Sequence, residues 1–408
     1  MRSGAGGVLC TATVRKLAPV EALFAGLATT VAYTVVVEGM LDTAALSQAF
    51  DAARRAHPVF AGRVVGTGDG YHLVVEGRGL PPIRVRKGTA RHPITRILDA
   101  ATELAGLEVV VGAGDHAVTL LTQHCIADAR ASLGLFAEIW ARYTDIVGGG
   151  RLSAVEPRPI PWSLNCLLAQ RGIADEAPEE ARGSAAPMMP SPAVGAPGDP
   201  EYARLRLTAP DTAVLAERGR RHGLSLHGIL SAGVLVAQAK TAGEEAVARL
   251  SYPVDLRDRV APPIGVFDGT NVVGSAEFSC AVRPGTALGP LAAAILRQLR
   301  ADLAAGAVHR SWLQVGSPAD PAPGAAPAIG MTNWGAVPVF VTPPGLVVTD
   351  FRGAITNLLP DPAESLFYIV SSVGGRLSVE LTVGGAQPVT DAEQMIAALA
   401  ETLRGFAG

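Results

Sequence analysis

Length, composition and charge exclude several classes of protein. The chain has 408 residues, of which 49% are hydrophobic and 17% charged, and its formal net charge is -3. This length exceeds a single ordinary core, so we expect about two domains with a substantial buried interior. Nucleic acid is not an expected partner, because proteins that bind it usually carry a strongly basic surface.

The cysteines and the N-terminus indicate the compartment. Cys10, Cys125, Cys166 and Cys280 are scattered without Cys-x-x-Cys spacing, so neither a zinc site nor a disulfide framework is predicted, and no metal is expected. Residues 1–9 lack the charged segment and apolar run of a secretory signal. The apolar stretch 228–239 is far shorter than the about 20 residues that span a bilayer, so it is predicted to be a core helix. We expect a cytoplasmic protein without a transmembrane segment.

The first half of the chain alternates predicted strands and helices. Strands are expected near residues 31–37, 71–76, 83–86, 107–111 and 117–122, and helices near 43–56, 93–104 and 131–147. The last of these helices has an apolar stripe formed by Leu135, Phe136, Ile139, Trp140, Tyr143 and Val147. The glycine-rich run 66–70 lacks the Gly-Lys-Ser/Thr ending of a phosphate loop, and it predicts a hairpin turn.

A break in periodicity divides the chain. Residues 175–200 are dense in Pro, Ala, Glu and Gly, which predicts a crossing linker between an N-terminal subdomain, 1–174, and a C-terminal subdomain, 201–408. In the second subdomain, strands are expected near 203–207, 246–252, 272–281, 328–334, 346–350, 366–372 and 377–382, and helices near 212–222, 226–240, 288–304 and 391–406. The predicted fold class is α/β (α+β), with a mixed sheet and helices in each half.

The segment from Gln123 to Asp128 carries the most informative motif. A predicted strand brings His124 to its end, and Asp128 follows four positions later. A neutral imidazole can take the proton of a hydroxyl or amine as that group attacks a thioester carbonyl, and the aspartate can fix the turn after the strand. A His-x-x-x-Asp spacing also arises often by chance, and a lone histidine at a strand end is more often structural. Cys125 is interpreted as a small apolar filler rather than a nucleophile.

Later segments give the motif a context. In order along the chain come a first strand with Val14-Arg15-Lys16-Leu17, a helix ending at His57, the His-x-x-x-Asp loop, Pro253-Val254-Asp255-Leu256-Arg257, Thr270-Asn271-Val272-Val273-Gly274 and Thr332-Asn333-Trp334-Gly335. This order resembles the condensation-domain and chloramphenicol-acetyltransferase-like superfamily. Within it, the chain resembles the stand-alone polyketide-associated acyltransferases typified by phthiocerol dimycocerosyl transferase.

The resemblance implies a fold and a reaction. Two chloramphenicol-acetyltransferase-like subdomains would form a pseudo-dimer around a tunnel, and an acyl group would pass from acyl-CoA or an acyl carrier protein to the hydroxyl of a polyketide, lipid or other natural product. The phosphopantetheine of the donor is part of the substrate, and no permanently bound cofactor is expected. The acceptor would be a small-molecule alcohol or amine, and the protein a monomer.

The resemblance also assigns roles to residues. His124 would be the general base, Asp128 a structural carboxylate and Arg257 the salt-bridge partner of Asp128. Asn271, Asn333 and Trp334 are candidates for lining the tunnel and for stabilising the oxyanion, although a structural hydrogen bond or core packing explains each of them more simply.

Two positions depart from the family pattern. Gln123 stands where peptide-forming condensation domains have a second histidine, which fits the acyltransferase branch. Ala129 replaces the usual glycine, which would allow a close backbone approach or a positive φ. Three hypotheses therefore remain: an O-acyltransferase, an amide-forming enzyme of the same fold, and a catalytically silent scaffold that docks a carrier protein.

Other histidines are given structural roles. His57 precedes Pro58 at a helix end, where we expect it to cap a carbonyl. His222 and His227 are five residues apart, not the three or four that place metal ligands on one helical face.

Overall fold

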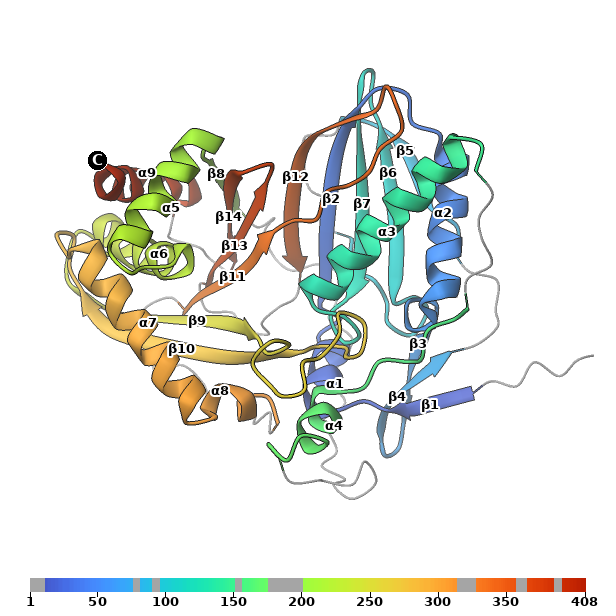
Figure 1. Ribbon diagram of the computed structural model, residues 1–408, viewed down its shortest axis with the longest axis horizontal. Helices are drawn as coiled ribbons and strands as arrows, with labels where there is room; N and C mark the ends of the chain where they lie inside the picture. The colour runs from blue at the N-terminus through green and yellow to red at the C-terminus, as the bar shows by residue number, and fades with distance from the viewer. Residues whose placement is uncertain are drawn as a thin grey trace, which may run out of the picture. The chain divides into compact units, whose positions relative to one another are not determined.

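The computed structural model describes residues 12–75, 81–89, 96–150, 156–174, 201–313, 328–356, 365–384 and 391–408 (Figure 1). The chain divides into two compact units. Unit 1 comprises Met1–Pro192, Ile264–Val272 and Phe340–Leu358, and unit 2 comprises Ala193–Pro263, Val273–Val339 and Leu359–Gly408. Two short segments from the second half of the chain thus belong to unit 1. The linker predicted at 175–200 lies outside the described residues, and the subdomain boundaries stay a prediction.

Unit 1 is built on a five-stranded mixed sheet. Its order is β12 (Val347–Thr356), β2 (Thr30–Glu38), β7 (Asp115–Gln123), β6 (Ala105–Val111) and β5 (Arg84–Lys87). Neighbouring strands are antiparallel, except that β5 runs parallel to β6. Every residue of β2 except Glu38 is buried. Thr34 of β2 lies opposite Thr119 of β7, and their hydroxyls share a hydrogen bond of 2.8 Å, which satisfies two buried polar groups in the sheet.

A second, antiparallel sheet of unit 1 has the order β1 (Ala12–Lys16), β4 (Gly70–Val75) and β3 (Arg63–Thr67). Thr67 pairs with Gly70, so a two-residue turn joins β3 to β4 and the predicted hairpin is confirmed. Helix α1 (Pro19–Gly26) follows β1 and was not predicted. Its start signals are nevertheless present, because Pro19 occupies the first helical position and Glu21 the third.

Helices α2 (Thr43–Ala56) and α3 (Ala129–Val147) of unit 1 pack against each other (Figure 1). Each begins at an aspartate whose side chain accepts hydrogen bonds from backbone N–H groups of the first turn, Asp42 for α2 and Asp128 for α3. The predicted apolar stripe of α3 is buried, except for Val147, which is 43% exposed because the helix ends there. One turn of 3-10 helix, η1 (Pro58–Ala61), follows α2, and the short helix α4 (Leu164–Ala169) comes later in the unit.

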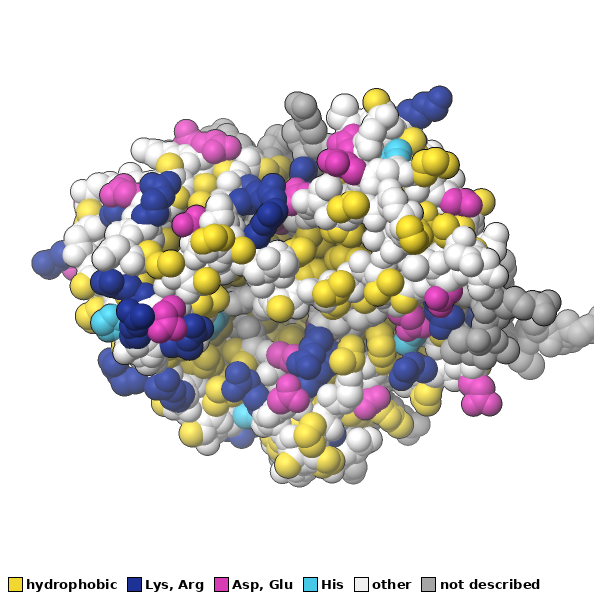
Figure 2. Space-filling view, turned by 45° about the horizontal axis from the view of Figure 1, so that its top comes forward, with side chains coloured by type: hydrophobic (Ala, Val, Ile, Leu, Met, Phe, Trp, Pro, Cys, Tyr) yellow, Lys and Arg dark blue, Asp and Glu magenta, His cyan; other side chains and the backbone are white. Residues whose placement is uncertain are grey.

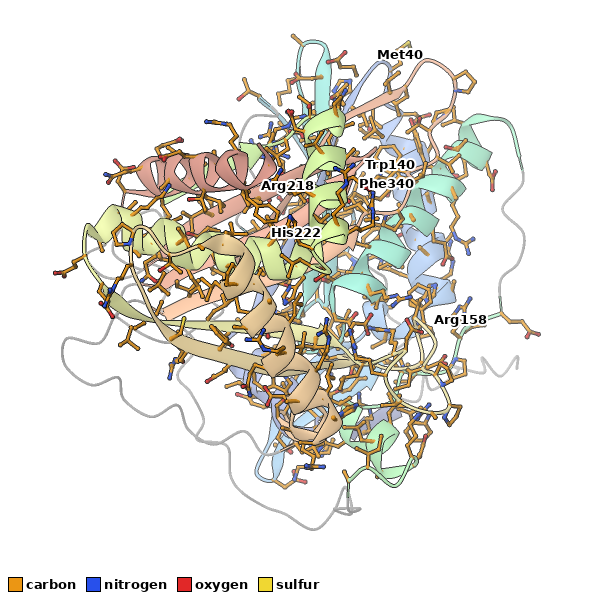
Figure 3. The ribbon with its side chains drawn as sticks, turned by 60° about the vertical axis from the view of Figure 1, so that its left-hand side comes forward. Met40, Trp140, Arg158, Arg218, His222 and Phe340 are labelled. Carbon is orange, nitrogen blue, oxygen red and sulfur yellow. The ribbon has the colours of Figure 1, made fainter. Side chains whose placement is uncertain are left out.

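An aromatic cluster joins α3 to the segment that precedes β12. Figure 3 shows Trp140 and Phe340 close together, and the ring of Phe136 lies 6.2 Å from Trp140 and 5.1 Å from Phe340 between centroids. Phe340 in turn lies 6.1 Å from Phe351 of β12. These contacts attach residues from late in the chain to unit 1.

The helix predicted at 93–104 is wrong for its described part, residues 96–104, which contains no helix. The Asp99 carboxylate accepts the N–H of Ala101 at 2.9 Å, as in a turn, and the carbonyl of Ala100 accepts the N–H of Val64 from β3 at 2.7 Å. Backbone groups that a helix would pair internally are therefore bonded elsewhere. The spacing of apolar residues in this stretch does not show that its backbone groups bond to a side chain and to another strand.

Unit 2 contains a six-stranded mixed sheet. Its order is β10 (Val273–Val282), β9 (Ala246–Asp255), β11 (Ala328–Ala336), β13 (Ser365–Val373), β14 (Arg376–Gly384) and β8 (Glu201–Arg206). β11 runs parallel to both of its neighbours, and the other pairs are antiparallel. The helices of the unit are α5 (Ala209–Arg221), α6 (Leu226–Ala242), α7 (Leu288–Ala304), α8 (Ala307–Arg310) and α9 (Ala392–Ala407). Each unit is thus a mixed sheet with helices, as the predicted fold class requires.

Helix α6 forms the core of the helical layer of unit 2. Every residue from Gly228 to Ala239 is buried, and α6 packs against α5, α7 and α9. The prediction of a core helix is confirmed. In the part of the chain that the structure describes, no helix combines the length and apolar character needed to cross a membrane.

Helix α5 packs on the C-terminal helix. The guanidinium of Arg218 on α5 lies over the ring of Phe406 on α9 at 5.9 Å. The ring of His222, which directly follows α5, lies 6.2 Å from the Phe406 ring, and Figure 3 labels Arg218 and His222. Side chains of both charges are interspersed on the face in Figure 2. Among the described residues, no group of three or more His, Cys, Asp or Glu side chains is arranged to hold a metal.

Candidate active site

His124 follows the last residue of β7, and both of its backbone groups are held. Its N–H donates to the carbonyl of Thr29 at 2.8 Å, and its carbonyl accepts the Nδ2 amide of Asn271 at 2.6 Å. Thr29 directly precedes β2, whereas Asn271 belongs to Ile264–Val272, called segment 264–272 below. The backbone of the histidine is therefore fixed between the central sheet and a segment from much later in the chain.

The hydrogen bonds of the His124 ring define its tautomer. Nδ1 lies 3.2 Å from the carbonyl oxygen of Ala127. A carbonyl can only accept, so Nδ1 carries the hydrogen and Nε2 has a free lone pair in the neutral ring. Burial lowers the pKa of His124, and the Asp128 charge and local hydrogen bonds oppose this only in part. The imidazole is thus neutral at physiological pH, in the state that a base requires.

One face of this imidazole is covered by an aromatic ring. Phe24 of α1 stacks on His124 with the ring centroids 4.2 Å apart and an interplanar angle of 4°. Phe24 was not among the residues predicted from the sequence, because α1 itself was not predicted. The helix-start signals at Pro19 and Glu21 would have predicted α1. They would not have predicted the stacking of Phe24 on His124, which joins positions 100 residues apart.

Asp128 ties the motif loop to its surroundings. Its carboxylate accepts the N–H of Ala131 at 3.0 Å, which caps α3, and the N–H of Val272 at 2.9 Å. Its own N–H donates to the carbonyl of Thr270 at 3.0 Å. The side chain is buried, and it joins the start of α3 to segment 264–272. These contacts are those of an architectural residue.

Ala129 is the first residue of α3. Among the described residues, the only non-glycine residue with positive φ is Ala28. Ala129 therefore has ordinary backbone geometry, and the replacement of glycine causes no strain of the left-handed kind.

A buried ion pair lies beneath the same loop. The Glu21 carboxylate, which is fully buried, accepts two hydrogen bonds of 2.7 Å from Arg15 and one of 2.7 Å from the N–H of Ala18. It also accepts the hydroxyl of Thr270. Because the carbonyl of Thr270 receives the N–H of Asp128, the ion pair is linked to the motif through one residue. This network was not predicted from the sequence, because its members are far apart along the chain.

The two residues beside His124 have structural roles. Cys125 is fully buried, and burial raises the pKa of its thiol, so it is protonated and inaccessible, as expected of a filler. Gln123, also buried, donates from its side chain to the carbonyl of Leu98. The residue in place of a second histidine thus connects β7 to the loop before β6.

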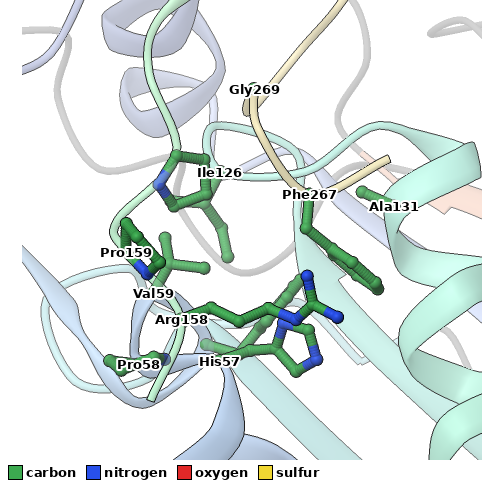
Figure 4. Close-up of a pocket in the computed structure, with 11 residues that line it drawn as sticks. His57, Pro58, Val59, Ile126, Ala131, Arg158, Pro159, Phe267 and Gly269 are labelled. Carbon is green, nitrogen blue, oxygen red and sulfur yellow. The ribbon is translucent and has the colours of Figure 1, made fainter. Parts of the chain in front are cut away.

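A small pocket in unit 1 lies beside the motif loop (Figure 4). It is lined by His57, Pro58, Val59, Phe60, Ile126, Ala131, Arg158, Pro159, Pro161, Phe267 and Gly269. Figure 4 shows Arg158 reaching toward Phe267, over whose ring its guanidinium lies at 5.3 Å. The Phe267 ring also lies 4.2 Å from that of His57. Phe267 thus anchors segment 264–272 near the end of α2.

His57 is the C-cap of α2, and its backbone N–H donates to the carbonyl of Ala53 at 2.9 Å, while its side chain bonds to another helix. Its Nε2 lies 2.7 Å from Oε2 of Glu138 on α3. Burial raises the pKa of Glu138, but hydrogen bonds from His57 and Arg142 outweigh that effect and lower the pKa to about 2. His57 therefore links α2 to α3 through a charged partner.

The remaining predicted site residues lie in unit 2. Arg257 is almost fully buried, and its Nη1 lies 3.2 Å from Oδ1 of Asp255. Asn333 is exposed, and its Oδ1 accepts the N–H of Gly335 at 2.9 Å, where β11 is irregular. Trp334 is half-buried on the same strand. The ion pair between Arg257 and Asp128, and the tunnel that Asn271, Asn333 and Trp334 would line, stay predictions.

Comparison with known proteins adds a second line of support. Residues 196–382 match the family model for the C-terminus of phthiocerol/phthiodiolone dimycocerosyl transferase. The phthiocerol/phthiodiolone dimycocerosyl transferase of Mycobacterium ulcerans (strain Agy99) is 34% identical over 395 residues, which cover 91% of this chain and 92% of that protein. The chain belongs to this family.

Solved structures agree with membership of the dimycocerosyl transferase family. Polyketide synthase associated protein 5 from Mycobacterium tuberculosis has a TM-score of 0.78 and 30% identity, and the match covers 97% of this chain and 98% of that one. The first condensation domain of the calcium-dependent antibiotic synthetase has a TM-score of 0.66 at 17% identity, with 98% and 96% covered, and shares the fold. The superfamily resemblance is confirmed, and the protein is an acyltransferase.

Proposed function

We propose that this acyltransferase moves an acyl group from a thioester to the hydroxyl of a lipid, polyketide or other natural product, with His124 as general base. The observation that carries the proposal is the state of the imidazole. The hydrogen bond from Nδ1 to Ala127 leaves Nε2 as the acceptor, and the lowered pKa keeps the ring neutral. A base so prepared typically contributes about 10²- to 10⁴-fold to the rate.

The reaction proceeds in two balanced steps. Nε2 of His124 takes the hydroxyl proton while the acceptor oxygen forms a bond to the thioester carbonyl carbon, which gives a tetrahedral intermediate and an imidazolium. The carbon–sulfur bond then breaks, and the departing sulfur takes the proton from Nε2. The products are an ester and a free thiol, and the imidazole is again neutral.

The donor and acceptor classes follow from chemistry and analogy. A thioester is already activated, so alignment and one proton transfer suffice and no permanently bound cofactor is needed. The donor thiol would be the phosphopantetheine of coenzyme A or of an acyl carrier protein. The relatives are named for dimycocerosyl transfer to phthiocerol or phthiodiolone, which favours a lipid-like alcohol as acceptor.

The candidates for the oxyanion donor differ in whether their N–H groups are already bonded. Nδ2 of Asn271 donates to the His124 carbonyl, which favours a structural role for Asn271. Oδ1 of Asn333 accepts the N–H of Gly335, a bond that does not use the Nδ2 donor, so the amide of Asn333 and the indole of Trp334 both stay candidates. Asp128 would support the site, with Arg257 as its proposed partner.

The first prediction concerns His124. We expect His124→Ala to reduce transfer by about 10²- to 10⁴-fold while the protein stays folded, because only the proton acceptor is lost. The assay is intact-mass detection of acylated products from a panel of acyl-CoA and acyl carrier protein donors with candidate alcohols. His116→Ala is the matched control, since His116 lies on β7, the strand that precedes His124, and its ring Nε2 lies 3.0 Å from the carbonyl oxygen of Gly39. Wild-type turnover by folded His124→Ala would contradict the proposal.

The same assay separates the alternatives. Amine acceptors that react faster than alcohols would identify an amide-forming enzyme. Product formation that survives His124→Ala but is abolished by deletion of the protein would identify a carrier-protein scaffold. The scaffold hypothesis arose from Ala129, whose backbone geometry is that of an ordinary helix start, so the O-acyltransferase is favoured.

A further inference from the structure

An aromatic side chain that stacks on the proposed base belongs to a separate helix. Phe24 of α1 covers one face of the His124 ring, at 4.2 Å between centroids and 4° between planes. The Nδ1 edge of the same ring is bonded to Ala127. One hydrogen bond alone leaves the imidazole free to tilt about the bond that joins it to Cβ, because this torsion has a broad energy minimum. The stacked ring removes that freedom.

Helix α1 is itself held against movement. Glu21 accepts hydrogen bonds from Arg15 of β1 and from the N–H of Ala18, and it also receives the hydroxyl of Thr270. Its carboxylate is fully buried, so loss of any partner would leave a charge poorly satisfied. Phe24 lies one turn further along this anchored helix and is 7% exposed. Its ring therefore has a fixed position relative to the motif loop.

We propose that Phe24 is a positioning residue for acyl transfer: its ring holds the plane of the His124 imidazole so that Nε2 stays where it takes the acceptor proton. This inference rests on the proposed role of His124 as base. The stacked ring also keeps water from one face of the imidazole, which contributes to the burial that keeps His124 neutral. The Phe24 ring has no group that can donate or accept the transferred proton, so its role is exerted through His124.

A buried phenylalanine can also be an ordinary core residue, and the two roles give different results. A core filler affects how much protein folds, but not the turnover of each folded molecule or the pKa of His124. A positioning residue affects both of these, and an aromatic replacement restores them. The test therefore needs a variant without a flat ring, a variant with one, and a core variant elsewhere in α1.

The experiment compares Phe24→Leu, Phe24→Tyr and Val20→Ala. The first keeps an apolar side chain but removes the ring, the second keeps the ring, and the third removes two buried methyl groups from the same helix. Turnover per folded molecule is measured with octanoyl-N-acetylcysteamine and octan-1-ol, neither of which titrates near the pKa of histidine. In parallel, the His124 pKa is measured without substrate by NMR titration of ¹³C-histidine protein.

We expect Phe24→Leu to lower kcat by about 10- to 100-fold with KM nearly unchanged, because small misplacements of a reacting group are costly. Its His124 pKa should rise toward 6.5, the value of an unperturbed histidine. Phe24→Tyr should retain wild-type kcat and pKa, and so should Val20→Ala. A Phe24→Leu protein with wild-type pKa, or a Phe24→Tyr protein whose pKa rises as far as that of Phe24→Leu, would overturn the proposal.

Two further measurements keep the result interpretable. If Phe24→Leu does not fold, the NMR spectrum of the wild-type protein tests the proposal. A ring stacked at this distance shifts the His124 Cε1–H resonance upfield, and an unshifted resonance would overturn the proposal. The His124→Ala variant tests the underlying assignment separately. Wild-type turnover in that variant would overturn the proposed base, whereas a loss in His124→Ala with no change in Phe24→Leu would overturn only the role of Phe24.

Discussion

Two neighbouring residues, His124 and Cys125, both have side chains that can react, but only the histidine is in a form that can take up a proton. His124 is half-buried, with a hydrogen bond at Nδ1 and a lone pair at Nε2. Cys125 is fully buried, and burial raises the pKa of its thiol. Both residues lie in the turn that follows β7, and only the cysteine is fully enclosed there. The residue types suggested which of the two was the base, and the burial pattern gives the physical reason.

The lowered pKa of His124 predicts a pH dependence. Only the neutral imidazole can accept a proton, so the rate falls as the pH drops through the His124 pKa. Because burial places this pKa below 6.5, the acid limb of kcat/KM, which reports the free enzyme, should have its midpoint below pH 6.5. A pH-rate profile with a donor that lacks phosphate groups measures this directly.

The matching control is the NMR titration of His124, whose midpoint should coincide with that of the rate. A rate midpoint at or above pH 6.5 would contradict the predicted neutral state. A rate midpoint that differs from the NMR midpoint would assign the acid limb to another group.

At the scale of elements, three pieces of the chain surround the motif loop. Helix α1 carries Phe24 and Glu21, helix α3 begins at Asp128, and segment 264–272 contributes Thr270, Asn271 and Val272. The apolar spacing predicted a helix at 131–147, and α3 begins two residues earlier, at Ala129, directly after its cap Asp128. The contribution of segment 264–272 could not be predicted, because it consists of hydrogen bonds to residues more than 140 positions away.

Thr270 offers a direct test of this connection. Thr270→Val removes the hydroxyl that donates to the buried Glu21 carboxylate but keeps the shape of the side chain. We expect the free energy of unfolding to fall by about 1.5–3 kcal/mol, the usual contribution of a hydrogen bond to a charged group. Chemical denaturation measures the change.

The control is Thr270→Ser, which retains the hydroxyl and should keep most of the stability. If Thr270→Val is as stable as the wild type, the hydroxyl contributes nothing measurable, and the hydrogen bond between α1 and segment 264–272 does not have the expected strength.

At the scale of the whole molecule, neither unit is one continuous stretch of the chain. Segment 264–272 and residues 340–358 come from the second half, yet they belong to unit 1. Strand β12 pairs with β2 along its whole length, from Val347 opposite Glu38 to Thr356 opposite Thr30. Its strand character was predicted from the sequence around 346–350. Its place beside β2 was not, since pairing across 300 residues leaves no local pattern.

The proposed ion pair between Asp128 and Arg257 joins residues of different units, and a double-mutant cycle tests it. We expect Asp128→Asn and Arg257→Gln each to destabilise the protein, since an unpaired buried charge costs about 3–5 kcal/mol. The double variant should be less unstable than the sum, with a coupling of about 0.5–3 kcal/mol. Chemical denaturation of the four proteins gives this coupling.

The control cycle pairs Arg257→Gln with Asp255→Asn, whose carboxylate lies 3.2 Å from the guanidinium within unit 2. Coupling in the control but additivity between positions 128 and 257 would show that Arg257 is satisfied inside its own unit, and would contradict the proposed pair.

The sequence by itself determined the α/β class, most of the helices and strands, and the pair of motif residues His124 and Asp128, because these depend on side-chain type and on spacing over a few residues. The tertiary structure decided the state of that histidine. Phe24, Ala127, Thr29 and Asn271 fix its ring and backbone, and Thr270 and Val272 hold the aspartate. Such contacts are set by how distant elements pack, and packing is a property of the folded chain rather than of any stretch of its sequence.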